Sequence, residues 1–464
     1  MKTTLLLALS FICSLFAAVY SVSAQGLTFT TNTYPVGSGP TVAVADVNRD
    51  GRLDLITANY NTNTLTVLTN NANGGFGSNA TLTVGNKPGG VTAADVNGDG
   101  YVDLIIANIG DNTFTVLTNN GSGVFGSNAT LYAGKTTGVI TAADINGDGY
   151  LDLLIPDIGS SDNLIVYTNN GHGVFGSNAT LTVGKTPNCV CATDVNGDGY
   201  VDLITANLGN NTLTVLTNNG KGVFGFNATV PVGNAPTWVT AADVNGDGYV
   251  DLIIANNGSN TLTVLTNNGK GVFGFNATLT VGRAPFWVLA TDLNGDGKLD
   301  LITVNNVNTT GVPGTGNTLT VLTNNGSGVF GSNATLTVGV GVINVLAADL
   351  NADGKPDLIA ANFHDNTVTV LMNTSIFPSP TNFPLLTINQ QGRNMRVSWP
   401  SVSPGWSLQE NSDLTRPKNW LPSGYDGYPV ADLGATYPIA DDGTNKSLTF
   451  PSYAGNLFFR LLHP

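Results

Sequence analysis

The chain has 464 residues, of which 10% are charged and 41% are hydrophobic, with 57 glycines and a formal net charge of −14. Its 17 Lys and Arg residues are scattered singly, without the basic stripe that recognition of nucleic acid requires. Low charge, with Val, Ile and Leu at strand-like intervals, excludes a disordered chain and favours a β-rich extracellular protein.

Residues 1–24 have the pattern of a secretory signal peptide. Lys2 precedes an apolar run, and the small residues Val22, Ser23 and Ala24 predict cleavage after Ala24. No later segment approaches the roughly 20 apolar residues of a membrane span. We therefore expect a secreted or cell-surface protein without a membrane span after cleavage. Of the three cysteines, only Cys189 and Cys191 would remain, and two buried thiols on one strand are expected rather than a disulfide framework.

An acidic motif close to DVNGDGYVDLI recurs seven times after this segment. Successive first aspartates are 49 or 50 residues apart, except for the last pair, which is 57 apart. Each unit predicts four short strands, as in WVTAAD, VDLIIAN, TLTVLTN and ATLTVG, and four antiparallel strands per unit are typical of a propeller blade.

The two ends of the repeat array predict that it closes into a ring. The last unit lacks its fourth strand, whereas LTFTTNTYPVG, at 27–37, precedes the first unit in the manner of a fourth strand. The N-terminal strand is therefore expected to complete the seventh blade and remove its open edge. The predicted fold is all-β, with a closed seven-bladed β-propeller over 27–373.

The acidic motif has the chemistry of a calcium loop. In every copy, positions 1, 5 and 9 are Asp, position 3 is Asn and position 6 is Gly, an order that matches the first half of an EF-hand loop. Position 7 varies, so only its backbone carbonyl could be a ligand. We expect up to seven structural Ca²⁺ ions rather than Mg²⁺; the alternative is a metal-free turn, in which the carboxylates would repel one another. The predicted ligands are Asp46, Asn48, Asp50, Arg52, Asp54, Asp95, Asn97, Asp99, Tyr101, Asp103, Asp144, Asn146, Asp148, Tyr150, Asp152, Asp194, Asn196, Asp198, Tyr200, Asp202, Asp243, Asn245, Asp247, Tyr249, Asp251, Asp292, Asn294, Asp296, Lys298, Asp300, Asp349, Asn351, Asp353, Lys355 and Asp357.

These loops, together with the segments GVFG and GNAPTWV, resemble the FG-GAP repeat of integrin α chains, also called the VCBS repeat. The resemblance extends over about residues 27–373. It implies a seven-bladed propeller with calcium in the loops between the first and second strands, on the bottom face, and a ligand on the opposite face. Relatives include adhesion receptors, fungal and bacterial lectins and some polysaccharide lyases, so the family indicates the fold more closely than the function.

Positions that differ between otherwise similar repeats are candidates for function. Five residues before each first Asp, where the innermost strand begins, the chain carries Thr41, Gly90, Val139, Cys189, Trp238, Trp287 and Asn344. Trp238 and Trp287, with Phe286, predict a site for sugar rings or a peptide on the face away from calcium. The alternative is that both Trp side chains fill the channel or pack between blades. His364 and Asp365 are expected in a solvated loop of the last unit.

Few residues are suited to catalysis. The only Glu, Glu410, lies outside the propeller, and no nucleophile motif, catalytic dyad or zinc set occurs. We therefore predict no enzymatic activity and expect a lectin-like binding or adhesion protein with an extracellular glycan or protein ligand. A polysaccharide-degrading, lyase-like enzyme and a purely structural surface protein are the alternatives.

The C-terminal part predicts a separate module. Residues 374–384 form a Pro/Ser-rich linker, and MRVSW, WSLQENSDL, KSLTF and NLFFRLL predict strands of a small β-sandwich over 385–464. The segment GWSLQENSDL…NW resembles fibronectin-like modules at the ends of secreted bacterial proteins. Its three Trp residues, Trp399, Trp406 and Trp420, are expected in the core of this module.

Overall fold

The computed structural model describes residues 26–71, 74–135, 139–159, 162–307 and 313–375, together with the strand segments 387–391, 394–400, 407–411, 421–422, 440–441, 445–451 and 458–462. Its regular elements are all strands, and none of the described residues belongs to a helix that could cross a bilayer. The predicted signal peptide lies outside the described residues. Two compact units divide the chain, Met1–Phe377 and Pro378–Pro464.

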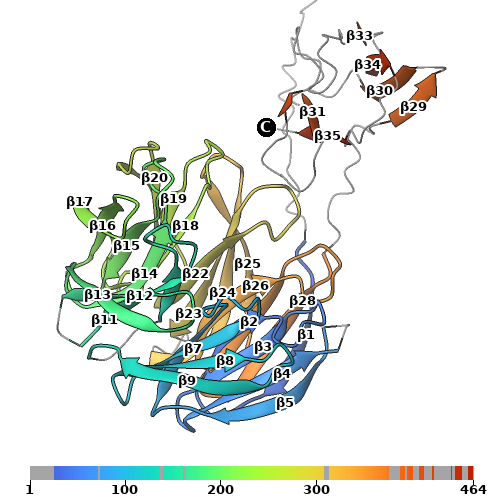
Figure 1. The fold of residues 1–464 in the computed structure, drawn as a ribbon. Coiled ribbons are helices and arrows are strands. Elements are labelled where there is room, and N and C mark those ends of the chain that lie inside the picture. The colour runs from blue at the N-terminus through green and yellow to red at the C-terminus, as the bar shows by residue number, and fades with distance from the viewer. Residues whose placement is uncertain are drawn as a thin grey trace, which may run out of the picture. The chain divides into compact units, whose positions relative to one another are not determined.

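The first unit is a seven-bladed β-propeller, as predicted, made of seven antiparallel four-stranded sheets (Figure 1). From first to fourth strand, the blades are β2 (Pro40–Ala45), β3 (Asp54–Asn59), β4 (Thr64–Asn70), β5 (Phe76–Thr83); β6 (Pro88–Ala94), β7 (Asp103–Asn108), β8 (Thr113–Asn119), β9 (Phe125–Tyr132); β10 (Thr141–Ala143), β11 (Asp152–Asp157), β12 (Asn163–Asn169), β13 (Phe175–Thr182); β14 (Pro187–Thr193), β15 (Asp202–Asn207), β16 (Thr212–Asn218), β17 (Phe224–Pro231); β18 (Pro236–Ala242), β19 (Asp251–Asn256), β20 (Thr261–Asn267), β21 (Phe273–Thr280); β22 (Pro285–Thr291), β23 (Asp300–Val307), β24 (Pro313–Asn324), β25 (Phe330–Thr337); and β26 (Val342–Ala348), β27 (Asp357–Asn362), β28 (Thr367–Asn373), β1 (Phe29–Pro35).

The seventh blade confirms the predicted closure. Its fourth strand is β1, which pairs antiparallel with β28 in a continuous register from Phe29 opposite Asn373 to Pro35 opposite Thr367. The first and last parts of the propeller thus share one sheet. The outer edge of β28, which would otherwise be open, is covered by main-chain hydrogen bonds.

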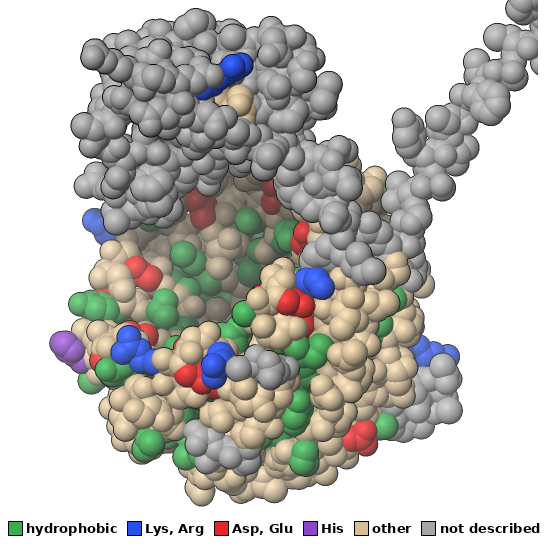
Figure 2. Space-filling view, turned by 90° about the vertical axis from the view of Figure 1, so that its right-hand side faces the viewer, with side chains coloured by type: hydrophobic (Ala, Val, Ile, Leu, Met, Phe, Trp, Pro, Cys, Tyr) green, Lys and Arg blue, Asp and Glu red, His purple; other side chains and the backbone are tan. Residues whose placement is uncertain are grey.

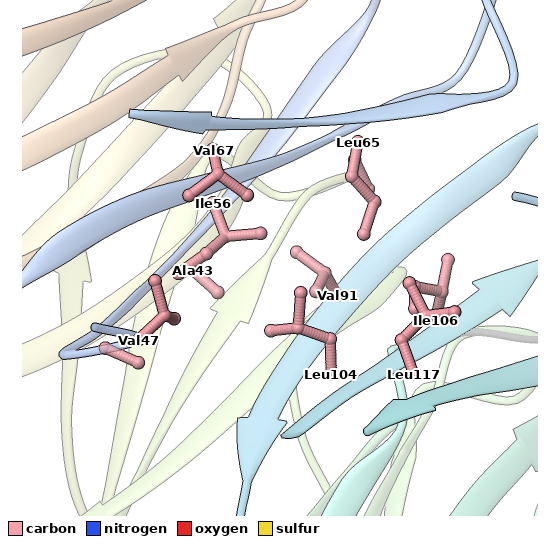
Figure 3. Packing of buried hydrophobic residues seen from close by; sticks show 11 residues of the cluster. Ala43, Val47, Ile56, Leu65, Val67, Val91, Leu104, Ile106 and Leu117 are labelled. Carbon is pink, nitrogen blue, oxygen red and sulfur yellow. The ribbon is translucent and has the colours of Figure 1, made fainter. Parts of the chain in front are cut away.

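The hydrophobic core consists of layers between neighbouring blades. The buried apolar residues of the described chain form seven clusters, one for each pair of adjacent blades. Figure 3 shows one layer, in which Ile56 and Val67 of the first blade face Leu104 and Ile106 of the second. Because side chains alternate along a strand, Leu55 packs instead against the seventh blade. This explains why each second strand is apolar along nearly its whole length.

The third blade departs from the others. Its first strand, β10, has only three residues. Next to it, Phe114 occupies a position that is Leu in most blades, and Ala133 occupies one that is Val. Both are buried, and Phe114 packs edge-on against Tyr167, with ring centroids 5.2 Å apart. A larger side chain therefore compensates for a smaller one within the same layer.

The described residues of the second unit also lie in strands. One sheet has the order β29 (Thr387–Gln391), β30 (Asn394–Pro400), β34 (Asn445–Pro451), β33 (Ala440–Asp441), and the other has the order β32 (Leu421–Pro422), β31 (Ser407–Asn411), β35 (Phe458–Leu462). Its resemblance to fibronectin-like modules stays a prediction. Among the Trp residues of this unit, Trp399 lies in β30, whereas Trp406 and Trp420 lie outside the described residues.

Candidate functional site

Each acidic loop connects the first and second strands of a blade and is folded by its own side chains. In the second blade, the Asp95 carboxylate accepts hydrogen bonds from the backbone N–H groups of Gly98 and Gly100, both at 2.8 Å. The side-chain oxygen of Asn97 accepts from the Asp99 N–H, and that of Asp99 accepts from the Tyr101 N–H. The bonds donated by positions 5, 6 and 7 recur in all seven loops.

The ninth-position aspartate anchors the loop to the blade. Asp103 is completely buried, and its carboxylate accepts hydrogen bonds from the N–H of Val96, at 3.1 Å, and from the N–H of Asn119, at 2.8 Å. Burial, followed by the neighbouring charges of Asp99 and Asp95, raises the pKa of Asp103, although the two backbone hydrogen bonds oppose this. The same causes raise the pKa of Asp152 and of Asp300 to about 6. The carboxylates at positions 1 and 5 are thus close enough to raise the pKa of the carboxylate at position 9.

An asparagine at the end of each third strand connects that blade to the loop of the preceding blade. The side-chain Nδ2 of Asn119 donates to the backbone carbonyl of Val47 at 2.8 Å and to that of Val102 at 3.0 Å. The bond to the preceding blade occurs seven times and includes the closing contact from Asn70 to the carbonyl of Leu350. We call Asn70, Asn119, Asn169, Asn218, Asn267, Asn324 and Asn373 the asparagine ring. This ring was not predicted, although the Asn recurs in every repeat of the sequence.

The donor set of each loop fits a hard cation. In the second loop, each oxygen of Asp95, Asp99 and Asp103 accepts one hydrogen bond and retains a second lone pair. At position 7, the Tyr101 ring lies over Gly121. In the first and seventh loops, the position-7 side chains instead form ion pairs with the position-5 carboxylates, Arg52 with Asp50 at 3.3 Å and Lys355 with Asp353 at 3.7 Å. Within the described residues, however, no three acidic, His or Cys side chains are gathered as in a formed metal centre. Calcium at the predicted ligands therefore stays a prediction.

The opposite ends of the first strands surround an apolar pocket of about 360 Å³. All seven blades contribute to its lining, which is formed by Gly39, Thr41, Tyr60, Pro88, Gly89, Ile109, Val139, Ile158, Asn188, Trp238, Phe286, Trp287, Asn306, Gly341, Ile343, Asn344, Phe363 and His364. The volume lies within the roughly 300–1,000 Å³ typical of ligand sites. We call this cavity the central pocket.

The three aromatic residues predicted to bind a ligand all line the central pocket. The rings of Trp238 and Trp287 are stacked, with centroids 3.4 Å apart and planes inclined by 21°. Both rings are half-buried. Trp238 also packs against the core layers on both sides of its blade, and Trp287 packs against the layer between the sixth and seventh blades. They therefore both pack between blades and form part of a pocket wall, so the two interpretations of the sequence are compatible. Cys189, at the equivalent position of the fourth blade, is buried, which raises the pKa of its thiol to about 12.

A second set of variable residues completes the pocket. Six positions after the ninth-position Asp, successive blades carry Tyr60, Ile109, Ile158, Leu208, Asn257, Asn306 and Phe363. All but Leu208 and Asn257 line the pocket. Their variation between repeats could have identified them, as it did the Trp residues. His364 also lines the pocket, whereas the Asp365 carboxylate accepts a hydrogen bond from the Val340 N–H at 2.7 Å.

Polar side chains of the central pocket connect neighbouring blades. The Nδ2 group of Asn188 donates to the carbonyl of Thr237 at 2.7 Å, and that of Asn306 donates to the carbonyl of Val342 at 3.0 Å. Asn344 bonds both the carbonyl and the N–H of Val42 in the first blade. Elsewhere, charged side chains are dispersed over the described surface, as Figure 2 shows for one side of the molecule.

Comparisons with known proteins agree with this architecture. The model of the FG-GAP-like repeat matches residues 46–106, 95–155, 194–254, 243–303 and 308–393, which together make up more than half of the chain. None of the curated proteins is significantly similar to the chain.

Several solved structures are similar to this chain. BBS1N, crystallised in complex with ARL6DN, is 11% identical with a TM-score of 0.55, over 76% of this chain and 98% of that one. A putative 6-phosphogluconolactonase from Bacteroides uniformis is 12% identical with a TM-score of 0.50, over 75% and 95% of the two chains. An Agrocybe aegerita lectin that recognises non-reducing terminal N-acetylglucosamine is 20% identical with a TM-score of 0.47, over 76% and 97%.

Proposed function

Since the chain belongs to the FG-GAP-like repeat family, we propose that it is a secreted, calcium-binding propeller that acts as an extracellular binding or adhesion protein. The observation that carries this proposal is the central pocket, to which all seven blades contribute side chains and which holds the stacked Trp238 and Trp287. A pocket built from the variable positions of otherwise uniform repeats is the expected location of a ligand site. The ligand is a glycan or a protein, bound on the face opposite the acidic loops.

Calcium has a structural role in this proposal. Positions 1, 3, 5 and 9 of each loop, with the backbone carbonyl of position 7, would hold the ion, which would supply positive charge to three neighbouring carboxylates. The loop aspartates number 21 of the 31 acidic residues of the chain, so seven divalent ions would offset its formal charge of −14. Each loop is also linked to the preceding blade through the asparagine ring. In the second blade, Asp103 accepts the N–H of Asn119, and the side chain of Asn119 donates to the Val47 carbonyl in the loop of the first blade. Calcium therefore stabilises the contacts between blades.

The described lining of the pocket lacks the pair of carboxylates that glycoside hydrolysis uses. Tyr60 and His364 are its only titratable side chains among the described residues, and no carboxylate lines it. Asp365, the nearest acid in sequence, lies outside the lining and accepts a hydrogen bond from the Val340 N–H. The absence of a carboxylate pair supports a binding protein rather than a hydrolytic enzyme.

The proposal is tested with arrays of extracellular glycans and proteins, probed by the full chain with calcium and with a chelator. We expect a ligand whose binding is lost in Trp238→Ala and Trp287→Ala. Phe226→Ala and Phe275→Ala are matched aromatic controls, because these side chains are 68% and 70% exposed on the outer strands β17 and β21. The BBS1N complex, in which a propeller of this fold occurs with a protein, supports including proteins on the array. Binding that is equal in all four variants would contradict the proposed site.

A further inference from the structure

The lining of the central pocket indicates which chemical group it can receive. Most of its side chains are apolar, among them Ile109, Val139, Ile158, Phe286 and Ile343. No Asp, Glu, Lys or Arg of the described chain contributes to the lining. The pocket therefore offers a ligand a large apolar contact area and no charged partner.

The polar side chains of the pocket are largely used within the protein. The amide nitrogens of Asn188, Asn306 and Asn344 each donate to a backbone carbonyl of the next blade. Turning one of them toward a ligand would leave that carbonyl without its partner. The hydroxyl of Thr41 is buried and has no hydrogen-bond partner, which shows how apolar its surroundings are.

A sugar ring fits this lining poorly. One face of a pyranose can stack on Trp, but its hydroxyl groups would face Ile, Val and Phe side chains that cannot replace the hydrogen bonds lost from water. An aromatic ring loses no such bonds and can pack against the Trp238–Trp287 pair in stacked or edge-on geometry. We propose that the central pocket receives an apolar aromatic group of the ligand. This inference rests on the proposed function, because it takes the same pocket as the ligand site.

The proposal is tested by ligand-observed NMR on the full-length protein, with indole and p-cresol as aromatic probes and methyl glucoside and N-acetylglucosamine as sugar probes. We expect saturation transfer to the aromatic probes and none to the sugars. A weak, millimolar affinity is expected, because each aromatic probe represents a single side-chain group of a larger protein ligand.

The variant that tests the location is Ile343→Asp, which places a charge in the pocket and should weaken binding of indole by about tenfold or more. If this variant does not fold, Ile109→Asp, in the loop after β7, replaces it. Phe226→Ala is the control and should bind as the unmodified protein does. Aromatic probes that do not bind, or that bind equally to Ile343→Asp, would overturn the proposal. A glycan whose binding requires Trp287 would also overturn it but would leave the proposed binding function intact.

Discussion

The two faces of the propeller make different use of one repeat. On the face with the acidic loops, the same hydrogen bonds from positions 5, 6 and 7 occur in every blade, and the asparagine ring is complete. On the face with the central pocket, equivalent positions range from Gly90 to Trp238 and from Ile109 to Asn306. The comparison teaches that uniformity in a repeat protein marks the residues that hold its units together, whereas variation marks the residues available for a ligand.

Removal of calcium should have the largest effect, and it should act through the uniform face. At a free concentration about ten times Kd, each site would contribute about 1.4 kcal/mol, so seven sites would contribute on the order of 10 kcal/mol. We expect a large fall in Tm when EDTA replaces calcium, measured by differential scanning calorimetry. Metal analysis of the folded protein should find up to seven calcium ions. An identical melting curve in EDTA would contradict the calcium proposal.

Loss of one member of the asparagine ring should have the next largest effect. Asn119→Ala removes the buried hydrogen bond to the Val47 carbonyl and the half-buried one to the Val102 carbonyl, and it should lower the free energy of unfolding by about 2–5 kcal/mol. The control is Asn120→Ala, because the exposed Asn120 side chain bonds only within its own turn. Urea denaturation gives both values. Equal, small losses in the two variants would show that the ring does not hold blades together.

Two aspartates of the second loop should differ in how their effect depends on calcium. Asp99→Asn should cost about 1–2 kcal/mol with calcium and almost nothing in EDTA, since Asp99 bonds only within its exposed loop. Asp103→Asn should destabilise the protein under both conditions, because its buried carboxylate accepts two backbone N–H groups. Thermal melts with and without EDTA provide the test. If Asp99→Asn cost as much in EDTA as in calcium, the loop would be a metal-free turn.

The smallest effect on stability is expected from the loss of a side-chain hydrogen bond at the end of a second strand, near the central pocket. The buried Asn59 accepts a hydrogen bond from the Thr57 hydroxyl at 2.9 Å, whereas the equivalent Asn108, two residues after Ile106, has a side-chain oxygen without a partner. Thr57→Val should therefore leave the Asn59 side-chain oxygen without a partner, as in the second blade, and lower the free energy of unfolding by about 1–2 kcal/mol. Denaturant titration measures this loss. An unchanged midpoint would show that this hydroxyl contributes nothing to stability.

Most of the propeller could be predicted because each blade follows from local patterns. The period of about 49 residues, the alternation in TLTVLTN and the displaced strand at 27–37 were sufficient for the blade number and the closure, which β1 and β28 confirm. Three of the aromatic residues of the pocket were also found, since Trp238, Phe286 and Trp287 differ from the other repeats at the start of an innermost strand, whereas Tyr60 and Phe363 were missed.

Contacts between blades could not be predicted from the sequence of a single repeat. The bond from Asn119 to Val47 joins residues 72 positions apart, and no spacing within a single repeat indicates it. Similarly, Tyr60 and Phe363 meet at 5.8 Å between ring centroids only because the ring closes the first blade against the seventh. Side chains that act across a blade boundary require the geometry of the whole ring.

The pairing of β1 with β28 has a consequence for folding during synthesis. Phe29 pairs with Asn373, so the seventh sheet cannot be completed until 344 residues after Phe29 have left the ribosome. Bringing together ends so distant costs on the order of 5 kcal/mol in chain entropy, apart from a constant. Contacts between residues so far apart in sequence form slowly. Until they form, the last strand of a nascent chain presents an open edge that can pair with another molecule.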